Sequence, residues 1–250
     1  FSLARKSFTI ATTTNQEVWG LSEHKVKRIT YFETPGPHNT DKVVEAVKER
    51  IKEGDVKHVV VASISGKTAL KFAEELRGTG VSVVCVSGYA GWVTQGGVEY
   101  PFVRGEVREK LEKLKVAIVD RTPSAFSGDT IDYGLARYGY IPPSWVASET
   151  LQAVGGYGLK TAIEVLLMAT DCNAVPPLAD VIAVAGTGEG ADTALVAKST
   201  FSTWMFSGDS ARRFQVLEIL AMPRTKKWYK SISVGGLSFQ EIEKGEILGE

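Results

Sequence analysis

The sequence predicts an α/β protein with a mainly parallel β-sheet, and three features of the chain support this prediction. Short runs of β-branched and other apolar residues alternate with longer segments of helical periodicity. The strand-like runs are apolar almost throughout, which is typical of parallel strands that helices cover on both faces. Segments rich in glycine, serine and threonine follow these runs, as expected for strand-to-helix loops.

The strand-like runs lie in order along most of the chain. They cover residues 29–33, 58–62, 81–87, 115–120, 181–185 and 215–222. Residues 1–28 lack a steady apolar period, so we expect an N-terminal arm before an α/β domain over residues 29–224. Residues 225–250 have weaker periodicity and are expected to form a C-terminal extension, either a hairpin or an irregular segment.

Helical periodicity fills the intervals between the strands. The first expected helix covers residues 42–54, with Thr40 or Asp41 as its cap. Its apolar face comprises Val43, Val44, Val47 and Ile51. Further helices are expected over residues 66–77, 105–114 and 144–171. Glycines 155, 156 and 158 are expected to bend or split the last of these helices.

The composition limits the classes of function. Lysine and arginine together number 29, as do aspartate and glutamate, so the formal net charge is zero. This balance argues against a nucleic acid or an anionic membrane as a partner. The two cysteines, Cys85 and Cys172, have no metal-ligand spacing and favour a reducing compartment. No apolar stretch reaches the ~20 residues of a membrane helix, so we expect a cytoplasmic protein.

Five polar loops are expected at one edge of the sheet, because ligands of open parallel sheets gather outside the carboxyl ends of the strands. These loops cover residues 34–40, 63–68, 87–92, 121–128 and 186–193. Each loop taken alone fits an ordinary tight turn equally well. Five such loops at one edge favour a binding site.

The loop with the sequence SISGKT, residues 63–68, favours a phosphate. Gly66 would let a ligand approach the backbone, and the following helix would present its free N–H groups at its positive end. The hydroxyl groups would come from Ser63, Ser65 and Thr68. Lys67 would add a cation or point into solvent.

The loop with the sequence GTGEGADT, residues 186–193, resembles a dinucleotide-binding fingerprint only loosely, because it lacks the GxGxxG spacing. Asp192 and Thr193 are expected to open another helix, with Asp192 as its cap. The loop would therefore contact a ribityl, ribose or ring group, or serve as a plain cap.

Several other residues have two interpretations each. Glu164 interrupts an apolar helix, and an ion pair with Lys160 one turn earlier is favoured over an isolated buried carboxylate. His38 fits an ordinary loop residue better than a general acid or base, since no serine or cysteine lies beside it in sequence. The aromatic residues near the loops are expected to cover the core rather than to stack on a ligand. They are Trp92, Phe126 and Tyr140.

Four motifs together resemble the C-terminal α/β domain of pyruvate kinase, and most closely the stand-alone archaeal and bacterial proteins called pyruvate kinase α/β-domain-like. They are YFETPGPHNT at 31–40, VVASISGKTAL at 60–70, GADTALV at 190–196 and AMPR at 221–224. The resemblance spans about residues 29–224. It implies a three-layer α/β sandwich and a bound flavin mononucleotide (FMN) with no assigned reaction. The chain has no kinase barrel, so no pyruvate kinase activity is expected.

The resemblance also implies which residues bind the ligand. Those for the phosphate are Ser63, Ser65, Gly66, Lys67 and Thr68. Those near the rest of the ligand are Asn39, Thr40, Gly186, Thr187, Gly190, Ala191, Asp192 and Thr193. The expected function is binding of FMN, with or without flavin-dependent catalysis. The alternative is a regulatory module that senses a sugar phosphate, and either version is compatible with a homo-oligomer.

Overall fold

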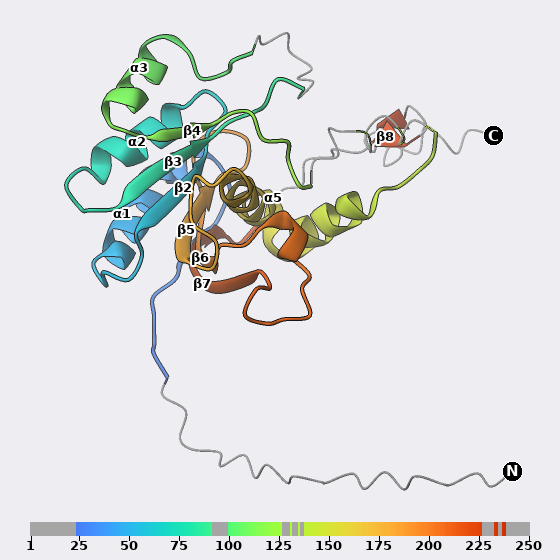
Figure 1. The fold of residues 1–250 in the computed structure, drawn as a ribbon. Helices are drawn as coiled ribbons and strands as arrows, with labels where there is room; N and C mark the ends of the chain where they lie inside the picture. The colour runs from blue at the N-terminus through green and yellow to red at the C-terminus, as the bar shows by residue number, and fades with distance from the viewer. Residues whose placement is uncertain are drawn as a thin grey trace, which may run out of the picture.

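The computed structural model describes residues 24–91, 100–126, 131, 135, 138–226, 233–234 and 237–238 (Figure 1). The described residues form a seven-stranded sheet with the order β1-β7-β6-β5-β2-β3-β4. Its strands are β1 (Thr30–Phe32), β2 (His58–Ala62), β3 (Ser82–Val86), β4 (Ala117–Val119), β5 (Asp180–Ala185), β6 (Thr193–Lys198) and β7 (Gln215–Pro223). All six strands that the sequence predicts are present, with small shifts at their ends.

The sheet is mainly parallel, as predicted. β2, β3, β4 and β5 pair in parallel, and β1 pairs in parallel with β7. β6 lies between β5 and β7 and runs antiparallel to both. Because β7 therefore points the same way as β5, the carboxyl ends of these strands lie at the same edge as those of β1 to β4.

Helices cover both faces of the sheet and give three layers (Figure 1). The helices are α1 (Thr40–Ile51), α2 (Lys67–Glu75), α3 (Gly105–Lys113) and α5 (Pro143–Asp171). Val59 and Val61 of β2 pack into the cluster that α1, α2 and α3 share, whereas Val60 packs into the cluster of α5. Successive residues of a strand point to opposite faces, so a strand covered on both sides is apolar throughout.

The first and last helices agree with their predicted patterns. The apolar face predicted for α1 is buried. Gly156 has φ 83° and ψ 173°, a non-helical conformation that divides α5 where the sequence predicts a bend. The predicted side-chain cap of α1 is wrong, since α1 starts at Thr40 and no side chain caps it.

The helix predicted to open at Asp192 and Thr193 is also wrong. Residues Thr193–Lys198 form strand β6, which is buried almost throughout and pairs with β5 and β7. A short apolar run does not distinguish a strand from a buried helix by its periodicity. Because the segment pairs with both β5 and β7, it forms a strand. Asp192 is therefore the last residue of a loop between two strands.

The two ends of the chain lie largely outside the described residues. Residues 24–29 precede β1 without regular structure, and Lys27 makes ion pairs with Glu53 and Glu218. In the C-terminal segment, β8 (Ser233–Val234) and β9 (Leu237–Ser238) pair antiparallel, as in the hairpin alternative. Among the helices of the described residues, none is long and apolar enough to cross a membrane.

Candidate functional site

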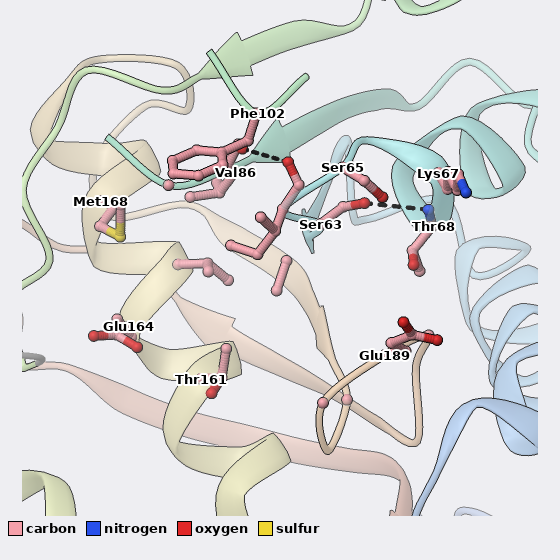
Figure 2. A pocket seen from close by; sticks show the side chains of 18 of the residues that line it. Ser63, Ser65, Lys67, Thr68, Val86, Phe102, Thr161, Glu164, Met168 and Glu189 are labelled. Carbon is pink, nitrogen blue, oxygen red and sulfur yellow. Dashed lines mark hydrogen bonds between the residues drawn. The ribbon is translucent and has the colours of Figure 1, made fainter. Parts of the chain in front are cut away.

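A cavity of about 610 Å³ opens at the carboxyl edge of the sheet (Figure 2). The described residues that line it from the loops and strand ends are Ala62, Ser63, Ile64, Ser65, Lys67, Thr68, Val86, Ser87, Gly88, Tyr89, Phe102, Ser124, Gly186, Gly188, Glu189 and Gly190. Those from α5 are Tyr157, Thr161, Glu164, Val165 and Met168. Within the described part of the chain, four of the five predicted loops thus reach the wall, and loop 34–40 does not.

The turn between β2 and α2 forms one side of the cavity. The Ser63 hydroxyl accepts a hydrogen bond from the Thr68 N–H at 3.1 Å, and the Gly66 N–H donates to the Ser63 carbonyl at 3.2 Å. Figure 2 shows Ser63, Ser65, Lys67 and Thr68 gathered around the start of α2. The turn therefore places hydroxyl groups, a lysine and the positive end of a helix at one end of the cavity.

Gly66 has a packing role that sequence reasoning did not identify. Its φ of 80° lies in the left-handed region, where glycine is favoured. A Cβ atom at this position would lie 2.9 Å from side-chain atoms of both Val103 and Val107. A glycine is therefore required where the turn packs against α3. Gly66 itself is not among the described residues that line the cavity.

The turn between β2 and α2 is fixed from below by the end of β3 and by Ser87, the residue that follows it. The Ser87 hydroxyl donates to the Ile64 carbonyl at 2.6 Å, and the Ser63 N–H donates to the Val86 carbonyl at 2.9 Å. Cys85 lies beneath with its Sγ 3.6 Å from the Ser63 carbonyl. Burial, assisted by the negative charge of Asp120, raises the pKa of the Cys85 thiol to about 12. This cysteine is therefore an uncharged core residue at neutral pH.

The glycine loop 186–192 forms the side of the cavity next to α2. A Cβ atom at Gly186 would lie 2.5 Å from the Gly190 carbonyl oxygen, and one at Gly190 would lie 2.7 Å from the Pro37 Cα. These two glycines let the loop fold tightly on itself and against loop 34–40. Gly188 and Glu189 at its tip also line the cavity.

Asp192 holds this loop from behind. Its side chain is fully buried and accepts hydrogen bonds from the Gly36 and Thr187 N–H groups, each at 3.0 Å, and from the Thr193 hydroxyl at 2.8 Å. Burial lowers the pKa of the nearby Lys226, which follows β7, although the charge of Asp192 acts in the opposite direction. Asp192 is thus a structural anion that joins loops 34–40 and 186–192.

Loop 34–40 braces the glycine loop. The Thr40 hydroxyl accepts a hydrogen bond from the Ala191 N–H at 3.0 Å and donates to the Pro37 carbonyl at 2.6 Å. The Asn39 side chain donates to the Thr34 carbonyl at 2.8 Å within its own loop. His38 lies in the same loop, with Nε2 3.4 Å from the Thr34 hydroxyl oxygen.

The structure therefore divides the residues predicted to bind a ligand into two groups. Those that line the cavity are Ser63, Ser65, Lys67, Thr68, Gly186 and Gly190. Those that are not among the described residues lining the cavity are Asn39, Thr40, Gly66, Thr187, Ala191, Asp192 and Thr193. The second group shapes the loops that the first group occupies.

The opposite side of the cavity comes from α5, which sequence reasoning largely missed. Figure 2 shows Thr161, Glu164 and Met168 along one face of this helix. The predicted ion pair is present: Lys160 Nζ lies 2.7 Å from Glu164 Oε2, and both side chains are buried. The Ser124 hydroxyl donates to Glu164 Oε1. Glu164 was the one sequence signal here, since a charge in an apolar helix needs a partner.

Aromatic side chains line the cavity from positions that the sequence did not single out. They are Tyr89, Phe102 and Tyr157. Phe126, in contrast, is buried in the core cluster of α5, and Tyr140 is exposed. Trp92 lies outside the described residues. In the described part of the chain, no group of histidine, cysteine, aspartate and glutamate side chains forms a metal site.

Fold and cavity together define an α/β protein with an open, mainly parallel sheet and a ligand-sized cavity at its carboxyl edge. No protein-family model matches the chain.

Proposed function

We propose that the protein binds a small phosphorylated ligand in this cavity, and that FMN is the best candidate. The observation that carries the proposal is the turn at the start of α2, whose residues Ser65, Lys67 and Thr68 line a cavity of about 610 Å³. Pockets for small ligands and cofactors have volumes of about 300–1,000 Å³. The cavity therefore suits a mononucleotide better than an inorganic ion.

The phosphate would lie at the start of α2. First-turn N–H groups have no partner within a helix, and the helix dipole favours an anion there. Ser63 uses its hydroxyl to accept from the Thr68 N–H, so its role is to shape the turn. Ser65 and Thr68 would donate hydroxyl hydrogen bonds, and Lys67 would add a positive charge.

The rest of the ligand would extend toward the apolar wall. Tyr89, Phe102 and Met168 line this part of the cavity. Flat aromatic rings and a thioether give good contact with a planar ring system. The resemblance to the pyruvate kinase α/β-domain-like proteins also supports FMN. A bound flavin would supply redox chemistry while these residues bind and orient it; we assign no reaction.

The first experiment is an absorption spectrum of the protein purified without added ligand, followed by mass spectrometry of whatever heat releases. Flavin bands and the mass of FMN are expected. A colourless protein that also fails to take up added FMN would exclude the flavin. Binding of sugar phosphates in its place would then favour a regulatory module without catalysis.

A charge placed in the turn tests the phosphate position. Ser65 is exposed and lines the cavity, so Ser65→Asp introduces a carboxylate there with little effect on packing. Repulsion between like charges is expected to weaken FMN binding at least tenfold, about 1.4 kcal/mol, in a fluorescence titration. Ser210→Asp makes the same change on an exposed loop and serves as the control. If both variants bind FMN with equal affinity, the phosphate does not lie at this turn.

A further inference from the structure

Glu164 is an unusual residue for the wall of a phosphate site. It is 6% exposed, it lies in a largely apolar part of α5 one turn after Lys160, and it lines the cavity. Acidic side chains are rarely buried unless they are paired. A carboxylate in this wall would also repel a phosphate that lay close to it. The side chain therefore has a different task from the turn at α2.

Two side chains fix the orientation of the Glu164 carboxylate. Lys160 Nζ, one turn earlier, donates to Oε2 at 2.7 Å, and the Ser124 hydroxyl donates to Oε1. Lys160 in turn lies 5.7 Å from the centre of the Tyr157 ring. Ser124 also accepts a hydrogen bond from the Phe126 N–H at 3.1 Å, which ties the loop after β4 to the helix. A carboxylate held this way is a pre-oriented acceptor.

The charged side chains of the described wall are distributed unequally. Lys67 lies at the start of α2, Glu164 lies across the cavity on α5, and Glu189 lies at the tip of the glycine loop (Figure 2). The start of α2 and Lys67 favour an anionic group on that side, where Glu189 of the neighbouring glycine loop acts against it. Within the described wall, the α5 side offers an anion no cation except Lys160, which is paired with Glu164. A group that donates hydrogen bonds, or a cation, is favoured at the α5 side. A ligand that matches both sides has two chemically different ends.

We infer that Glu164 is a specificity-determining residue that accepts hydrogen bonds from hydroxyl or N–H groups at the non-phosphate end of the ligand. The ligand class is a phosphate ester whose other end carries such donors, and inorganic phosphate or a bare polyphosphate does not meet this requirement. The inference rests on the proposed function, since it assigns the second end of the same ligand. Lys160 and Ser124 are positioning residues for the carboxylate.

The test separates the two ends of the ligand. Removing only one member of a buried ion pair leaves an uncompensated charge, whereas replacing both members is often tolerated. The variant is therefore Glu164→Gln combined with Lys160→Met. Its control is Glu106→Gln combined with Lys110→Met, which removes an exposed ion pair of the same i,i+4 spacing from α3. FMN, riboflavin and inorganic phosphate serve as probes in calorimetric titrations.

The double variant at Glu164 is expected to bind FMN and riboflavin at least tenfold more weakly and phosphate unchanged. Ser65→Asp is expected to weaken FMN and phosphate and to leave riboflavin unchanged. Wild-type affinity of the Glu164 double variant for FMN would overturn the inference and leave the proposed function intact. A wild-type protein that binds no probe would overturn the proposed function itself. If the wild-type protein binds ribose 5-phosphate and not FMN, ribose 5-phosphate and ribose serve as the probes in place of FMN and riboflavin.

Glu164→Asp is the second variant, in case the double variant does not fold by circular dichroism. It keeps the charge opposite Lys160 and withdraws the carboxylate by one methylene group. The same selective loss is expected: weaker riboflavin and FMN, unchanged phosphate. Wild-type affinity of Glu164→Asp for FMN would overturn the inference.

Discussion

At the scale of single residues, several side chains that look like ligand contacts in the sequence hold the site together instead. Asp192 accepts three hydrogen bonds from loops 34–40 and 186–192 and from β6. Thr40 joins the same two loops through Pro37 and Ala191. Gly66 is required by its positive φ and its contact with α3. A short polar motif marks the edge of the sheet at which the cavity lies, but neighbouring elements decide which of its residues line that cavity.

Asp192→Asn tests this structural role. The amide has the same shape, and its oxygen can still accept from the Gly36 and Thr187 N–H groups, but these two charge-assisted hydrogen bonds become neutral ones. Hydrogen bonds to a charged group contribute about 1.5–3 kcal/mol and neutral ones about 0.5–1.5 kcal/mol, so urea denaturation is expected to show a loss of about 1–3 kcal/mol. Asp180→Asn, at an exposed position at the start of β5, is the control. An Asp192→Asn protein as stable as the control would contradict the role.

At the scale of elements, the interruption of α5 positions one side of the cavity. Gly156 divides the helix, and Tyr157, Thr161 and Glu164 follow on the part that lines the cavity. The nearby Gly158 lies so close to Asp192 and Thr193 that a Cβ atom would collide with them. Gly158 therefore lets the helix approach the end of the glycine loop, and Gly156 places the interruption just before this contact.

Gly156→Ala is expected to destabilise the protein. The φ of 83° and ψ of 173° belong to a region that is essentially restricted to glycine, and other residues pay about 1–3 kcal/mol there. Gly54→Ala is the matched comparison, since Gly54 has the same φ but no atom within 4 Å of the added Cβ. Its expected cost is the left-handed conformation alone, about 1 kcal/mol. Thermal denaturation that ranks Gly54→Ala as the more damaging change would contradict this explanation of the kink.

At the scale of the whole molecule, the fold class was predictable but the sheet order was not. Runs such as 58–62 are apolar because both faces of β2 are covered, and that signal is visible in the sequence. β6 was missed because its six residues fit a buried helix equally well, and because its antiparallel pairing depends on distant β7. The α5 wall was missed for a similar reason: apart from Glu164, its residues look like core.

One ion-pair cluster joins the segment before β1 and helix α1 to strand β7. Arg50 of α1 is almost completely buried and donates to both carboxylate oxygens of Asp55, at 2.6 and 2.8 Å, and to Glu218 of β7, at 2.9 and 3.0 Å. Hydrogen bonding to Arg50 holds the pKa of Asp55 well below its usual range. Burial of Glu218 acts in the opposite direction, but Arg50 and Lys27 together still lower its pKa. These carboxylates stabilise the fold while they are charged.

The stability is therefore expected to fall on acidification, and Asp55→Asn tests the origin of this loss. A carboxylate whose folded pKa is lowered contributes its full stability above its unfolded pKa, about 3.9 for aspartate. The contribution is lost as the pH falls below that value toward the folded pKa. The difference in unfolding free energy between wild type and Asp55→Asn, from urea titrations between pH 7 and 2, should be constant above about pH 5 and shrink below about pH 4. Asp180→Asn corrects for the loss of one negative charge, and a corrected difference that stays constant down to pH 2 would show that the charge of Asp55 is not the origin of the acid-dependent loss.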